Sequence, residues 1–411
     1  MRTLLITGPG GAGRTTVAAA TALAAARAGH RTLVISADRA DTLGAALGAE
    51  LGEAPGEALG EAPDTAPAAP DAHPALTTLR LTTLRLAPAN RFRDDLLALQ
   101  ERAASALDLL GAERLDGEEL TPLPGAEELA LLRALRDAHR DGTYDTVVVD
   151  LPPTPQALAT LALPEQLRRY LRRLLPPERQ AARALRPMLG RLAGVPMPAA
   201  WLYEAAARGE DELAAVQRVI EAPGTTVRLV AEPGPAGADA VRAAVTGLAL
   251  HGLRTDLLVA NRILPDASPD TWLAGLGAQQ HKTLDAWEST YDHVVRAPHL
   301  GRDPRGADDL EALGLTAPAA APAPAAWPVT EAPEGDGGHT YVWHIPLPSV
   351  TREELGLIRR GDELVVTAGP YRRIVTLPSA LRRCTVAGAG LREGELRVRF
   401  APDPDLWPRE R

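Results

Sequence analysis

Short apolar runs alternate with segments of helical periodicity along the first three quarters of the chain. Residues 3–7 are largely apolar, a glycine-rich turn follows them, and an alanine-rich helical segment covers residues 15–28. Four further runs have the composition of buried strands, at 31–36, 146–149, 227–231 and 257–260. Buried runs between helices are typical of a mostly parallel sheet flanked by helices. We therefore predict an α/β fold for residues 1–314.

Two intervals interrupt this alternation. Residues 44–76 repeat Leu-Gly-Glu-Ala-Pro at 51–55 and 59–63, and they carry six acidic residues without a basic one. Such a segment buries too little apolar surface to fold, so we predict a disordered insert. Residues 165–220 place leucine and arginine at helical spacing. This pattern predicts a helical subdomain, with the arginines on a solvated face.

The pattern changes near residue 315. Residues 315–338 are rich in alanine and proline, which predicts a semi-rigid linker and a domain boundary. Short alternating runs separated by glycine and proline follow within residues 339–411. They predict a small C-terminal all-β sandwich of antiparallel strands. The four clearest runs are 341–345, 363–368, 373–377 and 395–400.

Composition and charge exclude several classes of function. The 411 residues include 53 acidic and 44 basic ones, for a net charge of −9, which argues against a nucleic-acid partner. The single cysteine, Cys384, excludes a disulfide framework and a thiolate zinc or metalloid site. No apolar run is long enough for a membrane span, and the N-terminal run is too short for a signal peptide. We therefore expect a cytoplasmic protein.

The turn after the first strand carries a phosphate-binding motif. Gly8-Pro9-Gly10-Gly11-Ala12-Gly13-Arg14-Thr15 matches G-x-x-x-x-G-K-[ST] at every defined position except the lysine. Glycines let backbone N–H groups curl around phosphate, and the following helix adds its positive end. The motif predicts a P-loop NTPase-type sheet that binds ATP with Mg²⁺. The predicted nucleotide contacts are Gly8, Gly10, Gly11, Ala12, Gly13, Arg14, Thr15 and Thr16.

Arginine stands where the motif has lysine. Lys282 is the only lysine in the chain, so the exchange at Arg14 is part of a general preference for arginine. A guanidinium keeps the positive charge, but it is planar and bulkier than an ammonium, so its geometry at the phosphates differs. We assign Arg14 a catalytic role in holding phosphate.

Three polar residues follow buried strands and complete the candidate site. Asp150 ends the run 146–149, where a carboxylate beside a phosphate loop is a Mg²⁺ partner together with Thr15; the alternative is a solvated strand-end aspartate. Asp38 follows the second strand. Asn261 follows the run 257–260 and could hydrogen-bond the edge of a base, although an asparagine there is more often a turn residue.

Together these motifs resemble the arsenical-pump and tail-anchored-protein-targeting ATPases, a deviant branch of the P-loop fold. Residues 9–16 resemble the family loop K-G-G-x-G-K-[ST]-[ST], and residues 36–43 and 150–158 are similar to its two switches. Residues 124–128 resemble its P-G-x-[DE]-E turn. The resemblance spans about residues 1–314. It implies that Asp38 activates the attacking water and that Asn261 recognises adenine.

The departures from the family pattern bear on activity and partners. The signature lysine, which reaches a partner's nucleotide across a dimer, is Pro9 here, and two switch histidines are Asp41 and Gln156. The second-switch glycine is Pro155. The zinc and metalloid cysteines of the family are absent, so we expect neither arsenite export nor a zinc-clamped dimer. The resemblance still implies two candidate partners, a second copy of the chain and a hydrophobic protein client.

The C-terminal region resembles a small heat-shock, α-crystallin-like sandwich. Residues 363–369, the pair Arg372-Arg373 and the last run, 394–400, with its G-x-L-x-V pattern, carry this likeness. Some members of the ATPase family carry such a domain. Its exposed edges could pair with an extended client or a second subunit. The equally weighted alternative is a domain that only packs on its own ATPase core.

Two functional hypotheses from different classes follow. The first is an ATP-binding protein of this family that hydrolyses ATP weakly or slowly, because Pro9 supplies no second cation to the transition state. The second is a catalytically inactive pseudo-ATPase that acts as a binding or chaperone-like scaffold through its sandwich. A partition ATPase of a neighbouring P-loop branch is a weaker third reading, since those proteins lack this second switch and the appended sandwich.

Overall fold

The structure is a computed structural model, and it describes most of the chain. The described residues are 1–36, 41–49, 58–59, 81–86, 93–94, 96–98, 100–101, 115–121, 123–174, 199–266, 269–318, 321–323, 327–333, 339–403 and 405–406.

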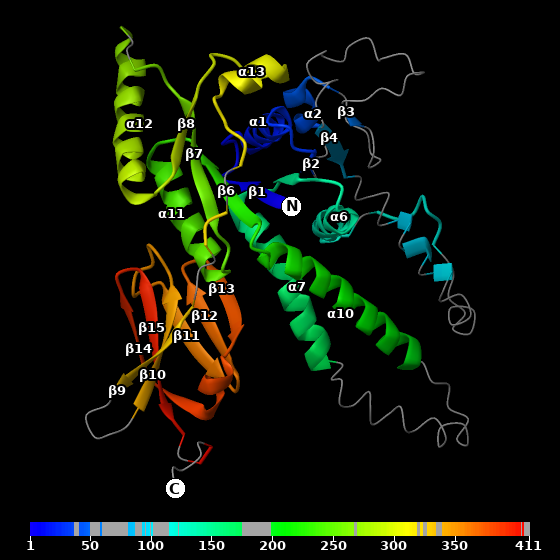
Figure 1. Ribbon diagram of the computed structural model, residues 1–411, viewed down its shortest axis with the longest axis vertical. Helices are drawn as coiled ribbons and strands as arrows, with labels where there is room; N and C mark the ends of the chain where they lie inside the picture. The colour runs from blue at the N-terminus through cyan, green and yellow to red at the C-terminus, as the bar shows by residue number, and fades with distance from the viewer. Residues whose placement is uncertain are drawn as a thin grey trace.

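One large sheet forms the centre of the N-terminal part (Figure 1). In the described chain its order is β3-β4-β2-β5-β1-β6-β7-β8, and every pairing is parallel except that of β3 with β4. The strands are β1 (Arg2–Thr7), β2 (Thr32–Ser36), β3 (Ala58–Leu59), β4 (Leu81–Arg85), β5 (Thr146–Asp150), β6 (Thr225–Ala231), β7 (Thr255–Ile263) and β8 (Val294–Pro298). The predicted α/β class with a mostly parallel sheet is confirmed.

Helices cover both faces of this sheet, because alternate side chains of each central strand point to opposite sides. In β1, Leu4 and Ile6 belong to one buried cluster, with α1, α2 and α13, whereas Leu5 belongs to the other, with α6, α7, α10 and α11. The helices are α1 (Arg14–Arg27), α2 (Thr42–Leu47), α6 (Ala126–Asp141), α7 (Thr154–Leu174), α10 (Ala199–Glu221), α11 (Pro235–Leu250), α12 (Thr271–Thr290) and α13 (Gly306–Ala312). Among the described residues, no helix combines the length and apolarity needed to cross a bilayer.

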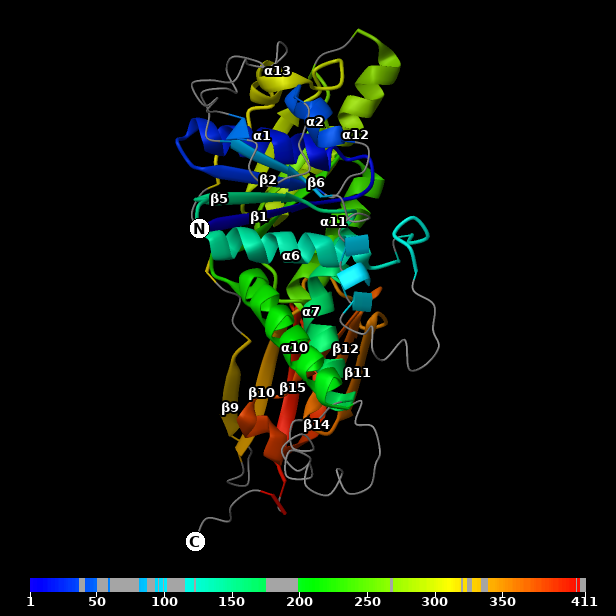
Figure 2. The same ribbon diagram turned by 90° about the vertical axis from the view of Figure 1, so that its right-hand side faces the viewer.

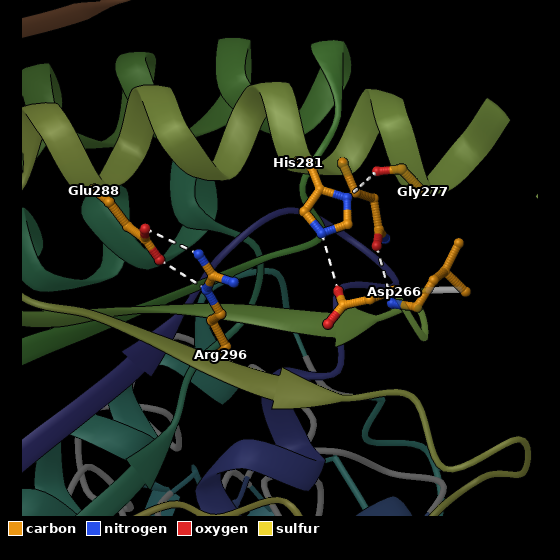
Figure 3. A network of polar contacts seen from close by, with 7 residues as sticks. Asp266, Gly277, His281, Glu288 and Arg296 are labelled. Atoms are coloured by element: carbon orange, nitrogen blue, oxygen red, sulfur yellow. Dashed lines mark hydrogen bonds and ion pairs between the residues drawn. The ribbon is translucent and has the colours of Figure 1, made fainter. Parts of the chain in front are cut away.

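Polar side chains attach α12 to the edge of the sheet (Figure 3). His281 contacts Asp266 at 3.0 Å, and the Glu288 carboxylate accepts two hydrogen bonds from Arg296 of β8, at 2.7 and 2.9 Å. The buried Gln280 amide accepts from the Leu264 backbone N–H and donates to the Arg262 carbonyl. This helix therefore braces the segment that directly follows Asn261.

The C-terminal part is a sandwich of two antiparallel sheets, in the orders β14-β15-β10-β9 and β11-β12-β13. Phe400, Ile345 and Val366 are buried between them. The strands are β9 (Val329–Pro333), β10 (His339–Pro346), β11 (Leu355–Arg360), β12 (Glu363–Ala368), β13 (Tyr371–Thr376), β14 (Cys384–Arg392) and β15 (Glu395–Pro402), with a 3₁₀ turn at Ser379–Arg383. This architecture confirms the predicted sandwich.

The sandwich packs on α11 of the larger part and is connected to α7 by ion pairs (Figure 2). Residues of both parts belong to one continuous buried cluster, including Leu158 of α7 and Tyr371 of β13. At Gly247 of α11 a Cβ atom would lie 2.4 Å from the Leu158 side chain and 2.8 Å from the Tyr371 ring, so any larger residue would require these side chains to shift. The Thr246 hydroxyl adds a 2.8 Å hydrogen bond to the Pro348 carbonyl.

Two predicted intervals differ from the observed structure. Residues 329–333 of the predicted linker 315–338 form β9, which pairs with β10 at the edge of a sheet, where proline's missing N–H is tolerated. Residues 44–47, placed in the predicted insert 44–76, belong to α2, because Leu43 and Leu47 pack into the core beside α1. Most of that insert lies outside the described residues. Of the interval 165–220, residues 165–174 and 199–220 are helical and 175–198 lie outside the description.

Candidate functional site

The glycine-rich loop lies at the carboxyl end of β1 and leads into α1, as the motif requires. A Cβ on Gly8 would lie 1.9 Å from the Val230 carbonyl oxygen, so this turn needs glycine. Gly13 has φ +86 and is the N-cap of α1, and a Cβ there would lie 2.3 Å from Asn261 Nδ2. Gly10 and Gly11 have open space around their Cβ positions. The loop thus has a fixed base and an open rim beside a helix N-terminus, which suits phosphate oxygens.

Thr15 and Asp150 lie together, as the sequence predicts for a Mg²⁺ pair. The Thr15 hydroxyl donates to Asp150 Oδ2 at 2.8 Å, and Asp150 is 6% exposed. Strand register places Asp150 level with Ser36 of β2, whose hydroxyl donates to the same carboxylate oxygen at 3.1 Å. Mg²⁺ takes oxygen ligands, one or two from the protein and the others from water and phosphates. The donor set therefore fits this ion.

The Arg14 side chain lies along the base of the loop. Its Nη1 donates to the Pro9 carbonyl at 2.7 Å and to the Gly8 carbonyl at 3.3 Å. Its Nε donates to the Leu151 carbonyl at 3.2 Å, just after Asp150. The guanidinium thus ties the phosphate loop to the segment that follows β5. A phosphate that recruited this cation would compete with these three carbonyls for its N–H groups.

Asn261 lies beside the loop. The buried amide donates from Nδ2 to the Ala12 carbonyl at 2.8 Å, so the side chain supports the loop. The same residue lines a cleft of about 260 Å³ together with Gly13 and Thr16. Arginine and histidine side chains form its far wall: Arg262, His299, Arg302 and Arg305. This cleft has the size and position for the nucleoside end of a nucleotide held by the loop.

A second cleft, of about 310 Å³, opens on the other side of the loop. Arg14, Thr15 and Asp150 form its floor, and the first two turns of α7 form one wall through Gln156 and Thr160. Glu127 and Glu128, at the start of α6, form another wall. The P-G-x-[DE]-E turn of the sequence is thereby placed at the phosphate end of the site.

The structure places only some of the other residues that the sequence analysis singled out. Asp38 lies outside the described residues, so the structure does not place it. Asp41 caps α2, since its carboxylate accepts from the Gly44 N–H at 3.2 Å. Pro155 lies in the first turn of α7, a position that proline tolerates. In the described ranges, no cluster of three or more histidine, cysteine or carboxylate side chains could hold a metal ion.

Two residues of the site were not predicted from the sequence. Ser36 shares Asp150 with Thr15, and Gln280 braces the segment after Asn261. Ser36 carried a usable signal, since it ends a buried strand just as Asp150 does. Gln280 carried no such signal, because it lies in the middle of a helix and becomes important only through the packing of α12.

The parallel sheet, with its glycine-rich loop and the Thr15–Asp150 pair at the carboxyl ends of its central strands, defines a protein of the P-loop class. The family model described as anion-transporting ATPase matches residues 1–63 and 70–317, and the model described as HSP20-like domain found in ArsA matches residues 338–400. The chain belongs to the anion-transporting ATPase family. The predicted resemblance to the arsenical-pump and tail-anchored-targeting ATPases, including the appended domain, is thus confirmed.

Comparison with curated proteins agrees with this assignment. An uncharacterized protein of Streptomyces coelicolor is 64% identical over the full length of both chains. A protein named putative arsenical pump-driving ATPase 1, from Aquifex aeolicus, is 25% identical over 97% of this chain and 99% of the relative. The ATPase GET3 of Podospora anserina is 25% identical over 76% of this chain and 88% of the relative.

Proposed function

We propose that the protein binds Mg-ATP in the loop Gly8–Thr16 and hydrolyses it slowly. The observation that carries this proposal is the 2.8 Å contact between the Thr15 hydroxyl and Asp150 Oδ2 at the mouth of the loop. The loop amides and Arg14 would hold the phosphates, and Thr15 and Asp150 would hold Mg²⁺, whose charge offsets that of the phosphates. The cleft beside Asn261 would take adenosine. Asp38 would orient the attacking water.

We expect slow turnover because the loop offers few cations to the phosphates. Pro9 offers no charge where the family has a lysine, and the Arg14 guanidinium is bonded to loop carbonyls. A second cation is worth on the order of 10³–10⁵ in rate in related phosphoryl-transfer sites. The site therefore supports nucleotide binding better than catalysis. The same contacts of Arg14 favour the second candidate function, an inactive pseudo-ATPase that acts as a scaffold.

Calorimetry with Mg-ATP, followed by a phosphate-release assay, separates these functions. We expect binding by the wild-type chain with slow phosphate release, and loss of release in Asp38→Asn. The double variant Pro9→Lys with Arg14→Lys should release phosphate at least about tenfold faster, because Pro9→Lys adds the missing cation and Arg14→Lys restores an ammonium at the phosphates. Brisk wild-type turnover would contradict slow hydrolysis. Binding without any release, in the wild type and in the double variant, would favour the scaffold.

The sandwich supports a further part of the proposal, the binding of an extended protein client or a second copy of the chain. β14 and β9 are the outer strands of one sheet, and β11 and β13 are those of the other, where β13 also packs toward α11. Ile358 of β11 is 51% exposed and Val386 of β14 is 41% exposed. An extended apolar segment could add to such edges. We place this activity in the cytoplasm, as the family resemblance implies.

A further inference from the structure

The far half of α7 is fastened to the sandwich by ion pairs. Arg169 donates from Nε and Nη2 to the two oxygens of Glu363 in β12, both at 2.7 Å. Arg373 of β13 donates to both oxygens of Glu165 at 3.1 and 3.3 Å, and also to the Leu250 carbonyl at 3.0 Å. The pairs are partly buried, with side-chain exposures between 16% and 30%. Bidentate pairs of this kind fix orientation as well as distance.

The near end of α7 is part of the phosphate site. The Thr7 hydroxyl of β1 donates to the Pro152 carbonyl at 2.8 Å, and the Thr154 N–H donates to the Gly8 carbonyl at 3.2 Å. Arg14 holds the Leu151 carbonyl in the same segment. One helix thus begins at the phosphate loop and ends at the sandwich, with ordered polar contacts at both ends.

Pro164 divides this helix into a half at the site and a half at the sandwich. Proline has no N–H, so the Thr160 carbonyl loses its helical partner there. The Thr160 hydroxyl, in the wall of the phosphate cleft, separately donates to the Gln156 carbonyl at 3.0 Å. An interrupted ladder lets the two halves adjust their relative direction more easily than an unbroken one would.

We propose that α7 couples the phosphate site to the docking of the sandwich, with the Arg169–Glu363 and Arg373–Glu165 pairs as the link. The inference rests on the proposed binding of Mg-ATP at the loop. Coupling of this kind is reciprocal, so the strength of docking must change nucleotide affinity as much as nucleotide changes docking. The sandwich then acts as a regulator of its own ATPase, in addition to any client that its edges bind.

The contacts of Arg14 give the coupling a sign. The structure contains both contacts at once: Arg14 donates to the Leu151 carbonyl, and Arg169 donates to Glu363. A phosphate that drew Arg14 away would remove one of the contacts that hold the segment before α7, and the start of the helix could then shift more easily. The ion pairs to the sandwich oppose that movement. Weakening them should therefore tighten nucleotide binding, and nucleotide should loosen the docked sandwich.

The test compares full-length variants by calorimetry with Mg-ATP. We expect Arg169→Gln and Glu363→Gln each to bind about three- to tenfold more tightly than wild type, and the double variant to match the singles because the pair acts as a unit. Arg168→Gln is the matched control. Arg168 lies on the same helix and carries the same charge, but its ion pair, at 3.0 Å, is with Glu210 of α10, inside the ATPase part.

Hydrogen exchange on the wild type supplies a second readout that needs no substitution. Mg-ATP should speed amide exchange in β12 and β13 while it protects the start of α1. Wild-type binding with unchanged affinities in the variants and unchanged exchange in these strands would overturn the coupling and leave the proposed function standing. Weaker binding in the variants would overturn its sign. A wild type that does not bind Mg-ATP would overturn the proposed function itself, and the coupling with it.

Discussion

A buried ion pair joins two neighbouring strands of the sheet and contacts α1. Arg228 of β6 is 1% exposed and donates to Asp256 of β7 at 2.8 Å and to the Thr21 hydroxyl of α1 at 3.0 Å. Arg2 lies close enough for its pKa to be lowered, mainly by burial and also by the charge of Arg228. A buried cation of this kind depends on its one carboxylate partner.

We predict that Asp256→Ala lowers the free energy of unfolding by about 3–5 kcal/mol, because it leaves the Arg228 charge buried without its partner. Urea denaturation followed by circular dichroism measures this. Asp239→Ala, which breaks the exposed pair of Asp239 with Arg242, is the control and should cost less than about 1 kcal/mol. Equal losses in the two variants would show that the buried charge finds another way to be solvated.

At the scale of single residues, the sequence predicts a functional site well when its residues lie in one continuous segment. The loop Gly8–Thr15 is of this kind, because the backbone that binds phosphate is itself the motif. The Asp150 position was also predictable, since it ends a strongly apolar run. The hydrogen bonds of Arg14 to Leu151 and of Asn261 to Ala12 were not, because they depend on the order of strands in the sheet.

At the scale of elements, helix packing against the sandwich depends on a glycine. Gly247 lies inside α11 at the point where Leu158 of α7 and Tyr371 of β13 meet the helix. Gly209, inside α10, has no neighbouring atom within 4 Å of its Cβ position. Both glycines therefore lie inside helices, but the Cβ position of Gly247 is crowded and that of Gly209 is open.

We predict opposite effects of alanine at these two positions. Gly247→Ala should lower the unfolding free energy by about 1–3 kcal/mol, because the added methyl group overpacks the contact of α11 with α7 and β13. Gly209→Ala should raise it by about 0.5–1 kcal/mol, through helix propensity alone. Thermal and urea denaturation of both variants check this. A stabilising Gly247→Ala would mean that the sandwich can move away from α11 at little cost.

Elements were predictable where burial on both faces makes a strand continuously apolar. The cores of β1 and β5 are of this kind, and each strand lies in the centre of the sheet. The strands that the hydrophobic pattern did not predict are mostly those that pair with a single neighbouring strand or have small side chains. β14 contains Gly388-Ala389-Gly390, and β9 lies in a proline-rich segment and pairs with β10. Such strands are specified by their neighbours rather than by their own residues.

At the scale of the whole molecule, the two parts meet around a cavity of about 380 Å³ that contains a histidine. His251, at the end of α11, lines it beside Arg373 of β13. Glu165, Arg169 and Arg372 line the same cavity. Burial, and secondarily the charge of Arg373, lower the pKa of His251 from 6.5 to about 4. The histidine is therefore neutral in the docked structure near pH 7. Because it lies where the sandwich packs on the ATPase core, the stability of that packing should depend on pH.

The sign of this dependence follows from proton uptake. Between pH 6.5 and about 4 the unfolded chain protonates His251 and the folded chain does not, so acid favours unfolding. We predict that lowering the pH from 7 to 5 costs the wild type about 1–2 kcal/mol more than it costs His251→Gln. Glu363, whose pKa is lowered by its hydrogen bonds with Arg169, loses its stabilising charge only below the ordinary carboxyl range. The two contributions are therefore separable.

Urea denaturation at pH 7 and pH 5 measures the effect, with His281→Gln as a control of opposite sign. The backbone carbonyl of Gly277 and the Asp266 carboxylate raise the pKa of His281, so its contribution is present at low pH and is lost as the pH rises. Acid should then destabilise His281→Gln more than wild type and His251→Gln less. Equal pH slopes for wild type and His251→Gln would contradict a neutral, buried histidine. In that case the titration of His251 would leave the joint between the sandwich and α11 unchanged.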